Sequence, residues 1–78
     1  SFKAVIVVVN TGKMPEEFLG RSIDHKLVGE LEDLGIDACG ENGEFHSFVY
    51  DGPLFEYPVN FSIRSTIRMD GYSYLEID

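Results

Sequence analysis

The feature that most constrains this chain is an unbroken apolar run near its start, in the segment Phe2–Asn10 with the sequence FKAVIVVVN. The run is rich in β-branched residues and shows no polar alternation, which indicates a strand buried on both faces. A chain of 78 residues has little material with which to cover an interior strand. We therefore expect either that one helix and a small sheet suffice, or that another domain packs against this strand.

One segment, Asp24–Leu34, has the pattern of an amphipathic helix. Asp24 suits the N-cap and Gly35 suits the position just past the C-terminus. The apolar positions that share one helical face are Leu27, Val28, Leu31 and Leu34. The preceding segment, Glu16–Ile23, is ambiguous, because its start is compatible with a helical turn that Gly20 then interrupts.

The remainder of the chain reads as turns and strands. Ile36–Glu44 is expected to be a loop, and Phe45–Tyr50 and Val59–Met69 are expected to be strands. Asp70–Gly71 is typical of a type I′ hairpin turn and is followed by a returning strand, Tyr72–Ile77. This order predicts a single α+β domain over residues 1–78, with one main helix and a small mixed, mostly antiparallel sheet.

The charge balance excludes some classes of partner. Six basic residues stand against fourteen acids, for a net charge of −8, which disfavours nucleic acid and anionic membrane surfaces. The apolar run Ala4–Val9 is too short to span a bilayer. The single cysteine, Cys39, allows no internal disulfide and fits a cytoplasmic location.

The stretch CGENGEFHSFVYDGP, Cys39 to Pro53, concentrates the candidate chemistry. Gly40 and Gly43 bracket an acidic loop that carries Glu41 and ends at Glu44. Glycine permits close backbone approach, so such a loop could bring a carboxylate to a ligand. If the strand begins near Glu44, that residue and His46 share a face.

Several interpretations of this stretch remain open from the residues alone. Glu41, Glu44 and His46, with Cys39, could ligate a metal, although the paired cysteines or histidines of a zinc site are missing. Cys39 could be a nucleophile activated by His46, although a lone cysteine is more often a small buried residue. A glutamate could act as a base or hold Mg²⁺ near a phosphate. The favoured alternative is a solvated acidic loop before a core strand, with His46 half-buried.

The block GENGEFHSFVYDGPLF, Gly40–Phe55, resembles the C-terminal motif of the diphthine–ammonia ligase family, which belongs to the PP-loop ATP pyrophosphatases or adenine nucleotide alpha hydrolases. The family motif is Glu-x-Gly-Glu-aromatic, leading into Phe-Val-x-Asp-x-Pro-Ile/Leu-Phe. The upstream Gly20, Arg21 and Asp24 are similar to the family's linker. Two departures are Ala38, where many relatives have proline before the cysteine, and His46, where other branches have a third acid.

The resemblance implies that this chain is the C-terminal domain of a longer protein. Family members bind ATP and Mg²⁺ mainly on an N-terminal PP-loop domain, through a Ser-Gly-Gly-x-Asp-Ser loop that this sequence lacks. The implied reaction adenylates a carboxylate and then lets ammonia displace AMP. The implied partners are the N-terminal domain, elongation factor two as substrate, and a second copy in a homodimer.

The resemblance also implies roles for the matching residues. Glu41 and Glu44 would act as bases, hold ammonium or help to bind Mg²⁺, with His46 as a weaker third catalytic candidate. Gly40 and Gly43 would shape the nucleotide-proximal loop. Arg21 follows a glycine and would contact a phosphate or the substrate, although a surface arginine is the commoner case. The alternative is a non-catalytic docking or dimerisation module.

Overall fold

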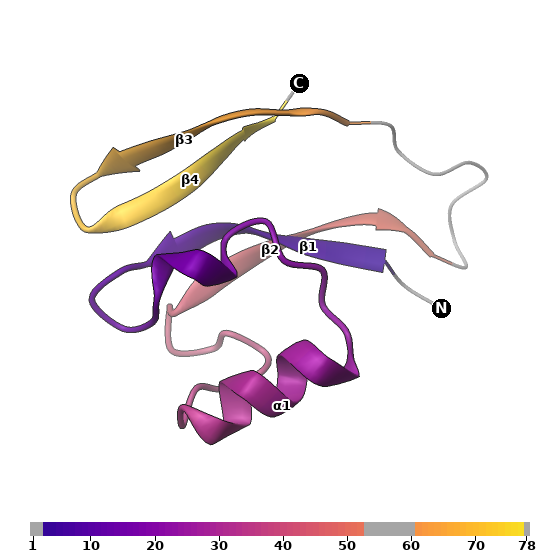
Figure 1. The fold of residues 1–78 in the computed structure, drawn as a ribbon, viewed down its shortest axis with the longest axis vertical. Helices are drawn as coiled ribbons and strands as arrows, with labels where there is room; N and C mark the ends of the chain where they lie inside the picture. The colour runs from indigo at the N-terminus through magenta and orange to yellow at the C-terminus, as the bar shows by residue number, and fades with distance from the viewer. Residues whose placement is uncertain (1–2, 53–60, 78) are drawn as a thin grey trace.

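The computed structural model describes residues 3–52 and 61–77. The elements in chain order are β1 (Lys3–Asn10), the 3₁₀ turn η1 (Glu16–Phe18), α1 (His25–Asp33), β2 (Phe45–Asp51), β3 (Ile63–Met69) and β4 (Tyr72–Ile77). The strands form one sheet in the order β2-β1-β4-β3, and every described pairing is antiparallel. One helix lies against one side of the sheet (Figure 1). The α+β prediction, with one main helix and a mostly antiparallel sheet, is confirmed.

Strand β1 lies inside the sheet, as its apolar sequence predicts, but burial on both faces is only partial: Val5, Ile6 and Val9 are buried, whereas Val7 and Val8 are partly exposed. It pairs with β2 along its length and with β4 only over its last residues, Val8–Asn10. Beside its first half runs the segment after η1, where the Ile6 N–H donates to the Arg21 carbonyl at 3.0 Å and the Gly20 N–H donates to the Ile6 carbonyl at 2.8 Å. Both edges of this half are therefore hydrogen-bonded, which buried backbone groups require.

A bulge in β1 adjusts which of its side chains reach the core. Ile6 pairs with Ser47 and Val8 pairs with His46, so Val7 has no partner of its own on β2. An extra residue of this kind shifts the alternation of faces. Ile6 and Val9, three residues apart, are consequently both fully buried in the cluster beneath α1.

Helix α1 begins and ends where its capping residues predict. The Asp24 carboxylate accepts the Leu27 N–H at 2.7 Å, and Gly35 follows the helix with a positive φ of 73°. Leu27 and Leu31 are buried, but Leu34 is 53% exposed. The prediction that Leu34 belongs to the apolar face is therefore wrong, because the helix proper stops at Asp33 and Leu34 lies at its C-cap.

The hairpin turn is confirmed, with φ values of 56° at Asp70 and 81° at Gly71. The predicted strand Phe45–Tyr50 is β2 with one additional residue. In the described part of the predicted strand Val59–Met69, β3 covers Ile63–Met69 and Phe61 precedes it; Val59 lies outside the described residues. The ambiguous segment after Pro15 forms the short η1 turn.

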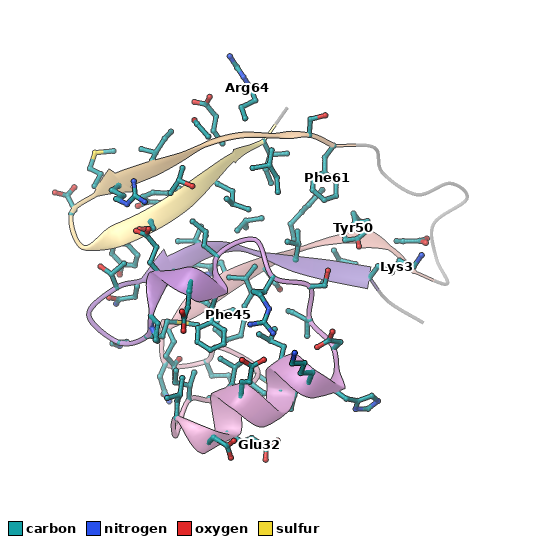
Figure 2. The ribbon with its side chains drawn as sticks, viewed as in Figure 1. Lys3, Glu32, Phe45, Tyr50, Phe61 and Arg64 are labelled. Carbon is teal, nitrogen blue, oxygen red and sulfur yellow. The ribbon has the colours of Figure 1, made fainter. Side chains whose placement is uncertain are left out.

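The hairpin of β3 and β4 curves over the sheet face that α1 leaves open (Figure 1). Phe61, which precedes β3, contacts β2 on this face: its ring centroid lies 5.6 Å from that of Phe48 and 5.0 Å from that of Tyr50. Figure 2 shows Phe61 and Tyr50 on the opposite side of the sheet from Phe45. Edge-to-face aromatic contacts stabilise such pairs by about 1 kcal/mol beyond their buried area.

The Glu16 side chain links η1 to the β3–β4 hairpin by hydrogen bonds. Its carboxylate accepts from Arg68 at 2.6 and 2.7 Å and from the Ser73 hydroxyl at 2.5 Å. The Arg68 hydrogen bonds, followed by that of Ser73, lower the pKa of Glu16 from 4.5 to about 2.

Within residues 3–52 and 61–77, no helix is long and apolar enough to cross a membrane.

The Glu16 carboxylate predicts a defined acid dependence of stability. Because the folded-state pKa of Glu16 lies below its ordinary value, its contribution is present above pH 4.5 and is lost as the pH falls towards about 2. In Glu16→Gln, unfolding followed by circular dichroism should show lower stability than wild type at pH 6. The difference should narrow between pH 4.5 and 2. If the stability difference between wild type and Glu16→Gln stays constant from pH 4.5 to 2, the ionised Glu16 carboxylate is not its source.

Candidate functional site

Three segments meet where β1 ends. The Asn10 N–H donates to the Glu44 carbonyl at 2.8 Å, which joins β1 to the acidic loop before β2. On the other side, the Thr11 N–H and hydroxyl both donate to the Gly71 carbonyl, at 2.9 and 2.8 Å. The β1–η1 turn, the start of β2 and the β3–β4 turn therefore lie at one end of the sheet (Figure 1).

The acidic loop is a succession of tight turns rather than an open segment. The Gly40 N–H donates to the Asp37 carbonyl at 2.9 Å, and the Gly43 N–H donates to the Gly40 carbonyl at 3.2 Å. The Cys39 N–H donates to the Asp37 carboxylate at 2.9 Å. Gly40 has a φ of 66°, and a Cβ at this position would lie 2.8 Å from the Phe45 carbonyl oxygen. The loop therefore needs glycine at position 40 for both its conformation and its close approach to β2.

The two glutamates of this loop occupy different environments. Glu44 is only 6% exposed, and its carboxylate accepts the Asn42 N–H at 3.0 Å and the Asp37 N–H at 3.3 Å. Its charge thus satisfies two backbone donors inside the loop. Glu41 is exposed on the same loop. Of the two, Glu41 is the carboxylate that a reactant can reach.

The remaining residues of the predicted cluster are not drawn together. His46 is exposed on the sheet face opposite Phe45, whose side chain packs in the core. Across the described ranges, no hydrogen bond or ion pair joins His46 to Glu41 or Glu44, and no group of three acidic, histidine or cysteine side chains could hold a metal ion. Cys39 is exposed rather than buried, so the expectation of a small core residue is wrong. The expectation of a half-buried His46 is wrong as well.

Arg21 lies elsewhere and already has a partner. Its guanidinium donates to the Glu30 carboxylate at 2.6 and 3.5 Å and lies 5.6 Å from the centre of the Phe18 ring. The Glu30 hydrogen bond raises the pKa of Arg21, and the same bond lowers the pKa of Glu30. Its backbone pairs with Ile6, four residues before Asn10 on β1, a strand distance of about 13 Å. The structure therefore separates Arg21 from the acidic loop.

Comparison with known proteins gives the family. The model of the diphthamide synthase C-terminal domain matches residues 1–77. This chain belongs to the diphthamide synthase C-terminal domain family. The diphthine–ammonia ligase of Homo sapiens is 34% identical over 55 residues, and that of Danio rerio is 33% identical over 66 residues.

These relatives are much longer than the chain. The human alignment covers 67% of this chain but 21% of the relative, and the zebrafish alignment covers 81% of this chain and 26% of the relative. The diphthamide synthase C-terminal domain thus spans about a fifth to a quarter of the curated proteins it matches. The matched residues include the whole acidic loop and β2, which ties the local geometry described above to this family.

The sequence analysis did not identify Lys13, whose side chain contacts the acidic loop. Lys13 lies in the turn after β1, and its ammonium donates to the Asn42 carbonyl at 2.6 Å. The two residues are 29 positions apart in the chain, so no local sequence pattern predicts the contact. A separate shallow hollow of about 620 Å³ is lined by Thr11, Glu16 and the β3–β4 hairpin.

Proposed function

We propose that this domain supplies part of the active site of an ATP-dependent ligase that forms an amide from a carboxylate and ammonia. The family membership supports the reaction class, because the matched relatives are named diphthine–ammonia ligase. The observation that carries the proposal for this chain is the exposed Glu41 carboxylate. It lies on a loop whose backbone is held in place by hydrogen bonds to the buried Glu44 carboxylate. A reactive side chain is most effective when its supporting backbone is fixed.

ATP and Mg²⁺ are assigned to the remainder of the full-length protein. The donor set of the described residues does not fit a nucleotide site, because Arg21 is bonded to Glu30 and no three potential metal ligands gather. Mg²⁺ commonly takes only one or two protein carboxylates and keeps several waters, so Glu41 would serve at most as one ligand. Bound ATP would supply the leaving group that makes the substrate carboxylate reactive.

Glu41 would act on the ammonia. At neutral pH ammonia is mainly ammonium, whose nitrogen has no lone pair for attack on a carbonyl carbon. A carboxylate at hydrogen-bond distance attracts the cation and can accept one of its protons, which frees the nitrogen lone pair. The ammonia would then attack the activated carbonyl carbon, the bond to AMP would break, and the nitrogen would lose a second proton to give the amide. Gly40 and Gly43 shape the loop that presents this carboxylate. Glu44 contributes indirectly by holding the loop, and His46 is left as a secondary candidate on the neighbouring strand.

The implied partners follow the same proposal. They are an N-terminal PP-loop domain in the same polypeptide and a substrate protein that carries diphthine, for which elongation factor two is the expected bearer. We infer a cytoplasmic location, since the exposed thiol of Cys39 is compatible with a reducing compartment.

A docking or dimerisation module is the second candidate, and the exposed strand β3 favours it. All seven residues of β3 are exposed, including Ile63 at 50% and Met69 at 57%. Exposed apolar residues on an edge strand offer a surface for another chain or domain. On this interpretation the acidic loop is only a well-ordered turn, and Glu41 plays no part in turnover.

The test is production of AMP and pyrophosphate by the full-length protein, given ammonium and a diphthine-bearing substrate. Glu41→Gln should lower kcat by about 100-fold, within the range expected for loss of a proton-transfer group. Glu32→Gln, at an exposed acid on α1 (Figure 2), is the matched control and should leave turnover unchanged. If Glu41→Gln turns over at the wild-type rate, the docking module becomes the better description.

A further inference from the structure

The backbone of Asn42 is held on both sides, in the peptide unit that precedes its Cα and in the one that follows it. Its N–H donates to the Glu44 carboxylate at 3.0 Å, and its carbonyl accepts from the Lys13 ammonium at 2.6 Å. The Lys13 nitrogen also lies 3.9 Å from the point where a Cβ on Gly43 would stand. Asn42 is therefore fixed at both its donor and its acceptor, and it directly follows Glu41 in the chain.

Lys13 is itself carried by a well-anchored turn. Its N–H and that of Met14 both donate to the Asn10 carbonyl, at 3.0 and 3.1 Å, and the Met14 side chain is buried in the core. The Asn10 N–H in turn donates to the Glu44 carbonyl. The turn and the acidic loop thus meet twice, once through backbone atoms and once through the Lys13 side chain.

The charges around this contact make Lys13 distinctive. The turn of residues 10–14 and the loop of residues 36–44 contain one basic residue, Lys13, and three acids, Asp37, Glu41 and Glu44. A hydrogen bond from a charged donor is stronger than one between neutral groups. The ammonium therefore offsets part of the loop's negative charge while it orients the Asn42 carbonyl.

We propose that Lys13 is a positioning residue for Glu41, and this inference rests on the proposed function. By fixing the peptide between Asn42 and Gly43, the Lys13 ammonium limits rotation of the Asn42 backbone, and this sets the direction in which the preceding residue, Glu41, presents its carboxylate. Without the ammonium the Asn42 carbonyl turns towards solvent, and the loop samples orientations in which Glu41 does not meet the ammonia. Lys13 acts through the backbone and does not touch the reactants.

The test compares Lys13→Met, Lys13→Arg and the control Lys26→Met in the full-length protein. Lys26 is an exposed lysine on α1, so its substitution makes the same charge change away from the loop. Lys13→Met should lower kcat about tenfold, since small misplacements of reacting groups cost at least this much. KM for the diphthine-bearing substrate should stay within twofold. Hydrogen exchange at residues 40–44 should become at least tenfold faster.

Lys13→Arg should recover most of the turnover, because a guanidinium can donate to the same carbonyl. Lys26→Met should match wild type in turnover and exchange. Wild-type turnover in Lys13→Met, whether or not exchange accelerates, overturns the positioning role. This outcome is distinct from failure of the proposed function, in which Glu41→Gln itself retains turnover and both ideas fall together.

Discussion

Replacing Gly40 by alanine is expected to destabilise this domain by about 2–5 kcal/mol. An L-residue in the left-handed conformation that Gly40 adopts, with φ of 66°, costs roughly 1–2 kcal/mol. The added Cβ would lie 2.8 Å from the Phe45 carbonyl oxygen, and relieving such a contact by shifting backbone costs roughly 1–3 kcal/mol more. Hydrogen exchange of the β1 amides measures the local free energy of unfolding.

Two other glycines separate the contributions of backbone conformation and contact. Gly35 has a φ of 73° but no atom within 4 Å of the added Cβ, so Gly35→Ala should cost only the conformational part, roughly 1–2 kcal/mol. Gly29 lies within α1 with equally open surroundings, and Gly29→Ala should stabilise by about 0.5–1 kcal/mol. Equal losses in Gly40→Ala and Gly35→Ala would show that the contact with Phe45 yields easily.

The parts of the fold that could be predicted from the sequence are those with local causes. The apolar run of β1, the Asp24 cap and the Asp70–Gly71 turn each depend on residues close together in the chain, and each is confirmed. The bulge at Val7 could not be predicted, because it depends on the register with β2. The contact of Glu16 with Arg68 spans 52 residues and has no local pattern.

The candidate site could also be predicted only in part. The sequence motif identified the acidic loop and both of its glutamates, but it did not distinguish Glu41 from Glu44. Their difference arises because the turns of the loop direct the Asp37 and Asn42 amides towards one carboxylate, which is that of Glu44. No alternation rule predicts this arrangement, since Glu44 precedes the strand and its side chain bonds within the loop.

Glu44→Ala is expected to destabilise the domain by about 3 kcal/mol. The substitution leaves the Asp37 and Asn42 N–H groups without their acceptor at a position only 6% exposed, and hydrogen bonds to a charged group contribute roughly 1.5–3 kcal/mol each. Glu44→Gln should lose about half as much, because its amide oxygen can accept one N–H while its NH₂ group opposes the other. Local hydrogen exchange at residues 36–44 measures both losses.

Glu41→Gln is the matched comparison, since the same chemical change at an exposed position should alter stability by less than about 0.5 kcal/mol. If Glu44→Gln proves as stable as Glu41→Gln, the Glu44 carboxylate does not hold the loop. The larger loss of stability expected for the Glu44 variants than for Glu41→Gln affects how activity measurements are interpreted. Loss of turnover in a Glu44 variant combines a disordered loop with any chemical role, whereas loss of turnover in Glu41→Gln, with the loop intact, reports on the chemistry alone.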